Sequence, residues 1–231
     1  AFQQLNRLEE ALTWYTSAVK EEPTEDALRG RADLLAYLKQ YEAAYEAYLE
    51  GLSLLDDVNL EIGAARTLRS LKRYEELLKF ISSHYDKFGS KLVDALVLRA
   101  ECLDKVSPNE AMAAWEQAVA ADHTHFFAKS GLMSCMIEQK KYHDVIDRVG
   151  KWVKEQPHLI RLNHFSLHAL NVLGRHKEVV DTVNGIFANK SHQVTQETSI
   201  DLVYNLIHAL YALEDWQSCY DGCKLHAKMA A

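Results

Sequence analysis

A stripe of apolar residues, often with large and small side chains in alternation, recurs along the chain. In its clearest copy, Tyr41, Ala44, Tyr48 and Gly51 follow one another at intervals of three, four and three residues. Such intervals place the four residues on one side of an α-helix. The stripe recurs in six further segments: Leu8, Ala11, Tyr15, Ala18; Tyr74, Leu77, Ile81; Ala111, Trp115, Ala118; Tyr142, Val145, Val149, Trp152; His176, Val179, Val183, Ile186; and Trp216, Cys219, Cys223. We therefore expect seven amphipathic helices of similar construction.

The stripes are spaced almost evenly. Their leading positions are 8, 41, 74, 108, 142, 176 and 216, which gives steps of 33, 33, 34, 34, 34 and 40 residues. A second amphipathic segment lies between stripes: Leu28, Ala32, Leu35, Leu38; Ala65, Leu68, Leu71; Leu96, Ala100, Leu103; and Leu167, Leu170, Leu173. Each period is predicted to hold a first helix, a short turn, and a second helix that carries the stripe. The long last step predicts either a longer connection over residues 189–197 or a lengthened following helix.

Turn and capping residues support these helix limits. Pro23, Pro108 and Pro157 fall at predicted helix ends, where a residue without an N–H group costs least. Helix starts are predicted at residues 23–26, 107–110 and 122–124, which carry suitable N-terminal residues. Polar pairs or a glycine separate the first from the second helix: Lys39-Gln40, Lys72-Arg73, Lys140-Lys141 and Gly174-Arg175.

A two-helix period of 34 residues resembles the tetratricopeptide repeat (TPR) family. The best match is residues 28–56, and residues 141–157 also match well. In the first of these, the small and large positions of the family are filled by Ala32, Leu35, Tyr41, Ala44, Tyr48 and Gly51. The opening Trp-x2-Leu-Gly of the family is missing throughout.

The resemblance implies an all-α fold: a right-handed α-solenoid, or superhelix, of about 6–7 TPR-like helix pairs whose first helices form most of a concave face. A single array over residues 1–231 would divide into repeats at about 1–23 (partial), 24–56, 57–90, 91–123, 124–157, 158–190 and 191–231. The apolar side chains of Leu5, Leu8 and Leu12 are predicted to pack against a preceding helix, so the chain is interpreted as a fragment of a larger protein. Apolar residues from Trp216 onwards predict self-association through the terminal repeats.

Composition limits the classes of function. Nine Gly and three Pro among 231 residues argue against a β-sandwich or barrel, which needs frequent tight turns. Lys and Arg number 26 against 33 Asp and Glu, a net charge of −7, which disfavours nucleic-acid binding. No apolar run is long enough for membrane insertion, and the N-terminus lacks the apolar core of a signal peptide. Four scattered cysteines predict reduced thiols in an intracellular protein, cytoplasmic or nuclear.

Candidate binding residues are those on the first helices that lie off the apolar stripe. We predict a partner-binding surface made of Arg66, Arg69, Phe127, Arg161, His164, His168, Asn171, Tyr204, His208 and Tyr211. The same face is predicted to carry Asp26, Arg29, Asp33, Asn59, Ile62, Asp94, Glu101, Asp104, Ser130 and Ser134. Some TPR proteins hold a peptide carboxylate with a Lys/Asn/Asn/Lys/Arg clamp. This sequence has Arg66 and Arg69 without a matching Asn pair, so no clamp is predicted.

Histidine and cysteine chemistry adds two alternatives. Residues 111–231 hold ten of the eleven histidines, whose protonation near pH 6 would make this part more positive, although scattered surface histidines need no special role. His164, His168 and His208 have the right chemistry for zinc, but no acidic or Cys partner stands at matching spacing, so no metal is predicted. Cys219 and Cys223 lie in apolar positions of the last stripe and are expected to be core thiols.

The sequence thus favours an interaction module over an enzyme. No phosphate-binding loop, dinucleotide fingerprint, nucleophile elbow or H-E-x-x-H motif is present, so neither catalysis nor a cofactor is expected. The favoured hypothesis is a scaffold that binds a peptide or partner subunit in a groove and assists complex assembly. The alternative is a non-catalytic region of a larger enzyme or transport machine that recruits substrate or packs subunits.

Overall fold

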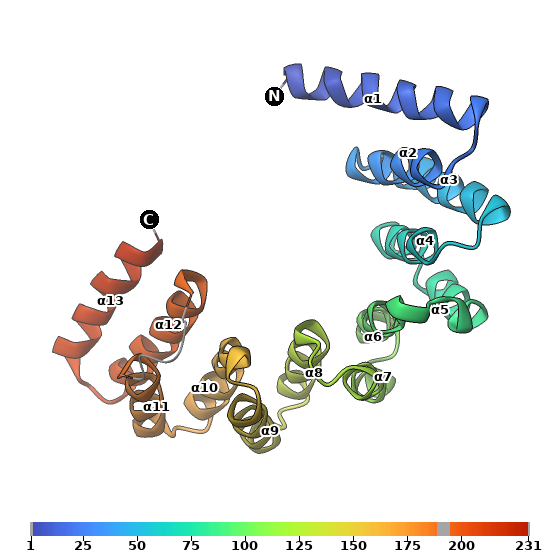
Figure 1. The fold of residues 1–231 in the computed structure, drawn as a ribbon. Coiled ribbons are helices and arrows are strands. Elements are labelled where there is room, and N and C mark those ends of the chain that lie inside the picture. Colours follow the sequence, from blue (N-terminus) through green and yellow to red (C-terminus); the bar gives the residue numbers. More distant parts are fainter. Residues whose placement is uncertain (1, 189–194, 231) are drawn as a thin grey trace. The chain divides into compact units, whose positions relative to one another are not determined.

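The computed structural model describes residues 2–188 and 195–230, and in this part of the chain every regular element is helical (Figure 1). The first helices are α2 (Glu25–Tyr37), α4 (Val58–Ser70), α6 (Leu92–Val106), α8 (Phe126–Glu138), α10 (Asn163–Val172) and α12 (Gln196–Ala212). The second helices are α1 (Phe2–Glu21), α3 (Tyr41–Leu54), α5 (Tyr74–Ser83), α7 (Pro108–Ala121), α9 (Tyr142–Glu155), α11 (His176–Ala188) and α13 (Trp216–Ala230). Six second helices therefore begin at the predicted leading positions.

The chain divides into two compact units, residues 1–128 and 129–231. In the N-terminal unit α3 packs between α2 and α4, and in the C-terminal unit α10 packs against α9, α11 and α12. The predicted stripe residues fill both cores, with Ala44, Tyr48 and Leu77 buried in the first unit and Val179 and Val183 in the second. The predicted repeat limits within one array stay a prediction.

Five of the six described turns between a first and a second helix share one backbone conformation, and the turn from α6 to α7 is the exception. The residue with positive φ is Lys39, Lys72, Lys140, Gly174 or Glu214, with φ between 58° and 72°. The N–H of the following residue bonds to a carbonyl five residues earlier, as from Gln40 to Leu35 at 2.9 Å. This pattern is a Schellman motif, which ends the first helix and turns the chain into the second. The polar pairs predicted as turns are therefore confirmed.

In two N-terminal repeats a glycine lets a tyrosine ring approach the next first helix. A Cβ atom on Gly63 would lie 2.4 Å from Cε1 of Tyr48, and a Cβ atom on Gly30 would lie 2.4 Å from Cε1 of Tyr15. Both glycines and both tyrosines are 33 residues apart. Close approach of helices around small residues thus repeats from one helix pair to the next.

Three 3₁₀ segments depart from a simple two-helix period. Between α5 and α6, η1 (Tyr85–Lys87) and η2 (Gly89–Lys91) surround the fully buried Phe88. Before α10, η3 (Pro157–Leu162) buries Leu159 and Leu162. The predicted helix start near Asp122 is wrong, because α8 begins at Phe126 and the Asp122 carboxylate accepts from the Thr124 N–H and hydroxyl instead.

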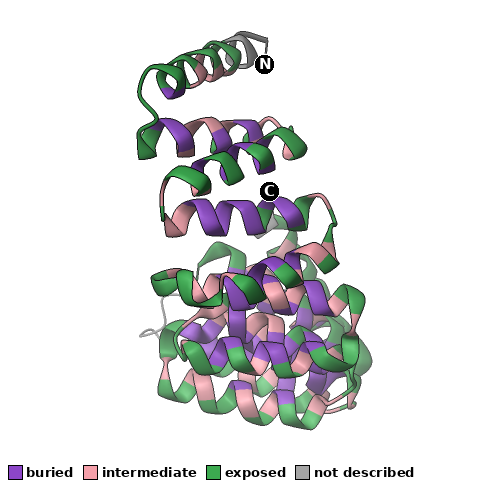
Figure 2. Cartoon of the chain, turned by 90° about the vertical axis from the view of Figure 1, so that its right-hand side faces the viewer, coloured by how far each residue is buried: buried purple, intermediate pink, exposed green. Residues whose placement is uncertain are grey.

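The two ends of the chain bury less than the interior. On α1, Val19 is buried while Leu8 and Leu12 are half-buried, and Figure 2 shows this helix largely exposed. Leu5 lies outside the residues whose side chains the structure describes. On α13, Cys219 is buried against α12, but Cys223 is exposed. The prediction of two core thiols is therefore wrong for Cys223, because the contact face of α13 is rotated away from it.

The long last step of the sequence is explained in part by α12. This helix has 17 residues, against 10 to 15 in the other first helices. The predicted longer connection falls mainly on residues 189–194, which lie outside the described part. Among the described helices, none has both the length and the apolar character needed to cross a bilayer.

The N-terminal unit buries one unbonded carboxylate. Glu61 on α4 is 1% exposed, and neither of its carboxylate oxygens accepts a hydrogen bond from the described residues. Lys87 Nζ lies 3.8 Å from Oε1, and His84 Nε2 lies 4.0 Å from Oε2. Burial raises the pKa of Glu61, and the nearby His84 and Lys87 oppose that shift only in part.

Candidate functional site

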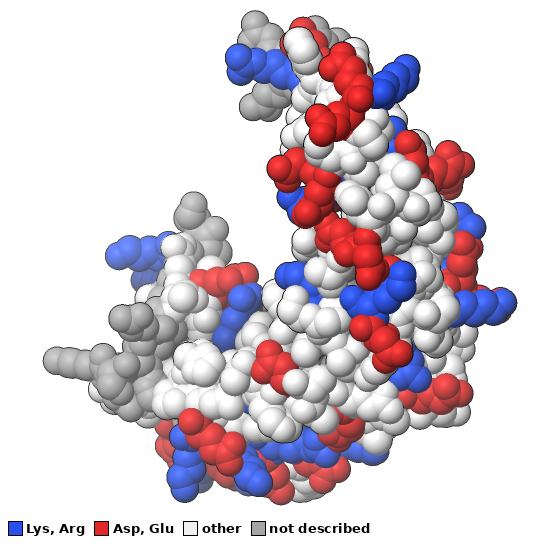
Figure 3. All heavy atoms as spheres, turned by 45° about the vertical axis from the view of Figure 1, so that its right-hand side comes forward, with Lys and Arg blue, Asp and Glu red and all other residues white. Residues whose placement is uncertain are grey.

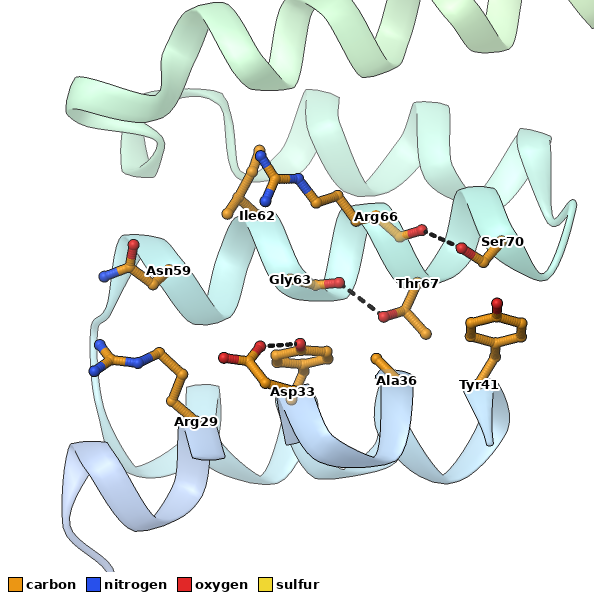
Figure 4. Close-up of a pocket in the computed structure, with 11 residues that line it drawn as sticks. Arg29, Asp33, Ala36, Tyr41, Asn59, Ile62, Gly63, Arg66, Thr67 and Ser70 are labelled. Carbon is orange, nitrogen blue, oxygen red and sulfur yellow. Dashed lines mark hydrogen bonds between the residues drawn. The ribbon is translucent and has the colours of Figure 1, made fainter. Parts of the chain in front are cut away.

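The first-helix face of the N-terminal unit forms a groove of about 580 Å³ between α2, α3 and α4. It is lined by Arg29, Asp33, Ala36, Tyr41, Tyr48, Asn59, Ile62, Gly63, Arg66, Thr67 and Ser70. Figure 4 shows Arg29 and Asn59 at one end and Tyr41 and Ser70 at the other. Five of the residues predicted for this face, including Arg66, therefore share one groove, which we call the N-terminal groove.

A hydrogen bond holds the floor of the N-terminal groove. The Tyr48 hydroxyl donates to Asp33 Oδ1, which joins a second helix to the preceding first helix (Figure 4). Burial and this bond raise the pKa of Tyr48 above its usual range, so the phenol stays protonated. The close contact with Gly63 fixes the position of the Tyr48 ring, and Asp33 Oδ1 is occupied by the hydrogen bond from Tyr48.

Arginines around the N-terminal groove are engaged in ion pairs. Arg29 contacts Glu25 at 2.7 Å and Asp26 at 2.8 Å, and Arg66 lies 3.7 Å from Asp94. Residues 1–110 carry a net charge of −6, and Figure 3 shows Asp and Glu side chains gathered along one side of this unit. The local carboxylates therefore neutralise much of the positive charge that the arginines bring.

The C-terminal unit has its own groove, of about 400 Å³, on first helices α8, α10 and α12. It is lined by Ser134, Ile137, Glu138, His164, Phe165, His168, Asp201, Tyr204 and Asn205. Three predicted binding residues, His164, His168 and Tyr204, are thus brought together from two helices. We call this surface the C-terminal groove.

The side chains of the C-terminal groove differ in how many contacts hold them in place. His164 Nδ1 lies 2.8 Å from the Arg161 carbonyl oxygen, and its ring lies 3.8 Å from that of Phe165. By contrast, His168 is exposed and Tyr204 is 63% exposed. The groove thus combines a fixed wall with two side chains that reach into solvent.

Solved structures share this arrangement of helix pairs. A scan against protein-family models finds no match, and a search of curated proteins finds none. YrrB, described as a TPR protein with an unusual peptide-binding site, is similar with a TM-score of 0.51 and 16% identity, over 87% of this chain and 97% of YrrB. A tetratricopeptide repeat protein from Parabacteroides merdae is similar with a TM-score of 0.60 and 13% identity, over 100% of this chain and 90% of that one.

The fold is that of the tetratricopeptide repeat. The predicted all-α fold of TPR-like helix pairs is therefore confirmed, with six pairs following α1 in the described residues. The small residues Ala44 and Gly51 and the large residues Tyr41 and Tyr48 occupy one TPR second helix, as the resemblance implied.

Not all predicted residues reach a TPR groove. Asn171 is buried, donates to the Asn205 carbonyl at 3.0 Å and contacts His176, so its amide holds TPR helices together. Arg161 lies in η3 rather than on a first helix, because the chain forms a 3₁₀ turn after Pro157, and it pairs with Glu197 at 2.9 Å.

The remaining predicted residues lie outside the grooves. Arg69 pairs with Glu101 between α4 and α6, and Phe127 is exposed on α8. His208 has its ring 6.4 Å from that of His176, and the exposed Tyr211 packs edge-on against Trp216. His208 does not line the groove that holds His164 and His168. Among the described residues no group of three or more His, Cys, Asp or Glu side chains could hold a metal ion.

Sequence reasoning missed five residues of the C-terminal groove. Ile137, Glu138, Phe165, Asp201 and Asn205 line it but were not predicted. Asp201 precedes Tyr204 by three residues, so helical spacing from the predicted tyrosine could have found it. Glu138 gave no comparable signal, because it lies at the last turn of α8, where the repeat pattern does not fix which side chains face a neighbour.

Proposed function

We propose that this TPR protein is a protein–protein interaction scaffold that holds a peptide or partner subunit on its first-helix face and assists complex assembly. The observation that carries the proposal is the C-terminal groove, where the TPR first helices α10 and α12 bring His164, His168 and Tyr204 together. Exposed tyrosines beside a fixed wall are typical anchors of protein interfaces. The similarity to YrrB, a TPR protein described as having a peptide-binding site, supports a peptide as the ligand.

The size and chemistry of the grooves favour a peptide segment over other ligands. Grooves of about 400 and 580 Å³ have room for a few side chains of a partner. Acidic charge along the N-terminal unit disfavours nucleic acid. We therefore propose a non-catalytic, intracellular role without a cofactor, in which shape and a few anchor side chains select the partner.

Capture of binding partners tests the proposal. The chain, immobilised and exposed to an extract of its source cells, is compared with two variants of the grooves, Arg66→Ala and His168→Ala/Tyr204→Ala. A matched control, His143→Ala/Phe187→Ala, removes one exposed histidine and one exposed aromatic residue from second helices α9 and α11. Captured proteins are quantified by mass spectrometry after cross-linking.

We expect the groove variants to lose bound proteins that the control retains. Loss in the control alone would place binding on the second helices and contradict the proposal. Equal capture by all four proteins would show that neither groove contributes. Far-UV circular dichroism of each variant separates lost binding from lost folding.

A further inference from the structure

The C-terminal groove offers acceptors without a cation to balance them. Among the nine described residues that line it there is no Lys or Arg, whereas Glu138 and Asp201 contribute carboxylates from α8 and α12. Neither carboxylate has an ion-pair or hydrogen-bond partner among the described residues. The N-terminal groove is different, since Arg29 and Arg66 each lie near a carboxylate.

A nearly buried amide adds an acceptor to the same wall. Asn205 is 7% exposed, its Nδ2 donates to the Asp201 carbonyl at 2.9 Å, and its own carbonyl accepts from Asn171 at 3.0 Å. Its side-chain oxygen Oδ1 accepts no hydrogen bond from the described residues. Because this oxygen is not fully buried, it can accept a hydrogen bond from a donor on a ligand in the groove.

Aromatic rings stand beside these acceptors. Tyr204 is 63% exposed and follows Asp201 by three residues on α12, while Phe165 forms part of the wall. Aromatic faces attract ammonium and guanidinium groups and also cover the apolar stems of lysine and arginine. Acceptors and rings in one groove therefore match a long cationic side chain better than an anion or a purely apolar one.

We propose that the C-terminal groove recognises a lysine or arginine side chain presented by a peptide segment of a partner protein. The inference rests on the proposed function and names the chemistry of its ligand. Glu138 and Asp201 supply charge, Asn205 accepts a hydrogen bond, and Tyr204 covers the stem. An acidic segment is rejected by the same carboxylates.

Blocked peptide pools test this specificity. The probes are fluorescein-labelled octapeptides with amidated C-termini and a fixed central residue, either Lys, Arg, norleucine or Glu, and an equimolar mixture of Ala, Ser, Leu and Tyr elsewhere. Fluorescence anisotropy with the full chain measures their affinities. We expect the Lys and Arg pools to bind roughly fivefold more tightly than the norleucine pool, the Glu pool to bind most weakly, and the difference to shrink in 0.5 M salt.

A charge-matched pair of variants shows where the preference arises. Glu138→Gln/Asp201→Asn removes the two groove carboxylates, and Glu155→Gln/Asp181→Asn removes two exposed carboxylates from α9 and α11. We expect the first variant to lose the preference for Lys and Arg and the second to keep it. Thermal unfolding confirms that both are folded, and the charge-conserving variant Asp201→Glu keeps the preference if charge is its cause.

Several results would overturn the inference. These are equal binding of all pools, tighter binding of the Glu pool, a preference that survives Glu138→Gln/Asp201→Asn, and no binding of any pool. If all pools bind equally and Tyr204→Ala weakens each of them, the scaffold function stands while the basic specificity fails. The capture experiment decides the scaffold function independently of the pools.

Discussion

Gly63→Ala is the most direct test of how neighbouring TPR pairs fit together. The added Cβ atom would lie 2.4 Å from Cε1 and 2.6 Å from Cζ of Tyr48, distances that real Cβ atoms do not show. Tyr48 is 3% exposed and its hydroxyl donates to Asp33, so the ring cannot move aside without breaking a bond. The substitution therefore strains the packing and the floor of the N-terminal groove together.

The expected change in the free energy of unfolding combines one stabilising effect with two destabilising effects. Alanine gains about 1 kcal/mol over glycine inside a helix. Overpacking costs about 1–3 kcal/mol, and losing a hydrogen bond to a charged group costs about 1.5–3 kcal/mol. We expect a net loss in the free energy of unfolding of about 1.5–5 kcal/mol if the bond to Asp33 is broken, and of about 0–2 kcal/mol if Asp33 keeps its bond.

Urea unfolding followed by far-UV circular dichroism measures the change. Gly150→Ala is the control, because a Cβ atom there meets nothing within 4 Å, and we expect it to stabilise by about 1 kcal/mol. Gly30→Ala repeats the clash against Tyr15, which is 38% exposed and can swing outward, so its cost should be smaller. In a Tyr48→Ala background Gly63→Ala should no longer destabilise. Stabilisation by Gly63→Ala in the wild-type chain would refute the argument.

Three further predictions rest on other features of the structure. Lys140→Gly relieves a left-handed backbone at φ 58° and should raise the urea midpoint, by about 1 kcal/mol in free energy; an unchanged midpoint would show that the turn is not strained. Burial raises the pKa of Glu61 above its ordinary 4.5, so its stabilising effect is present below that pH and lost as pH rises through the raised pKa; Glu61→Gln should therefore raise the urea midpoint at pH 7 but not at pH 4.5. Light scattering at rising concentration should show self-association that Trp216→Ser reduces, since this indole is exposed on the terminal helix, and a monomer at every concentration would contradict it.

The helices were predictable because their spacing depends on a repeated local pattern. A small residue at one position and a large one four residues later must face a neighbouring helix, so the stripe fixed the starts of α3 and α9 within the sequence itself. The pattern failed at α13, where Cys223 continues the stripe yet is exposed. The contact with α12 buries Cys219 and leaves Cys223 exposed, so the stripe alone does not say which of its residues a neighbouring helix covers.

The candidate site was only partly predictable for a related reason. Tyr204 and His168 follow from the outward positions of first helices, whereas Glu138 joins them through the approach of three helices in space. Asn171 was predicted from the same outward positions, but its side-chain amide donates a hydrogen bond to another helix. Periodicity gives the face of a helix, and only tertiary contacts decide which polar residues on that face stay free for a ligand.

The contact between a tyrosine ring and a glycine defines a unit of the N-terminal repeats that can be duplicated. Gly30 and Gly63 contact their tyrosine rings in the same geometry, so residues 31–63 begin just after one such glycine and end with the next. A tandem duplication of these residues would carry its own tyrosine and its own glycine. We expect it to add one helix pair to the stack of helices, with each tyrosine ring still facing a glycine. The same complementarity predicts that ring and glycine change together during divergence, because neither tolerates a new neighbour alone.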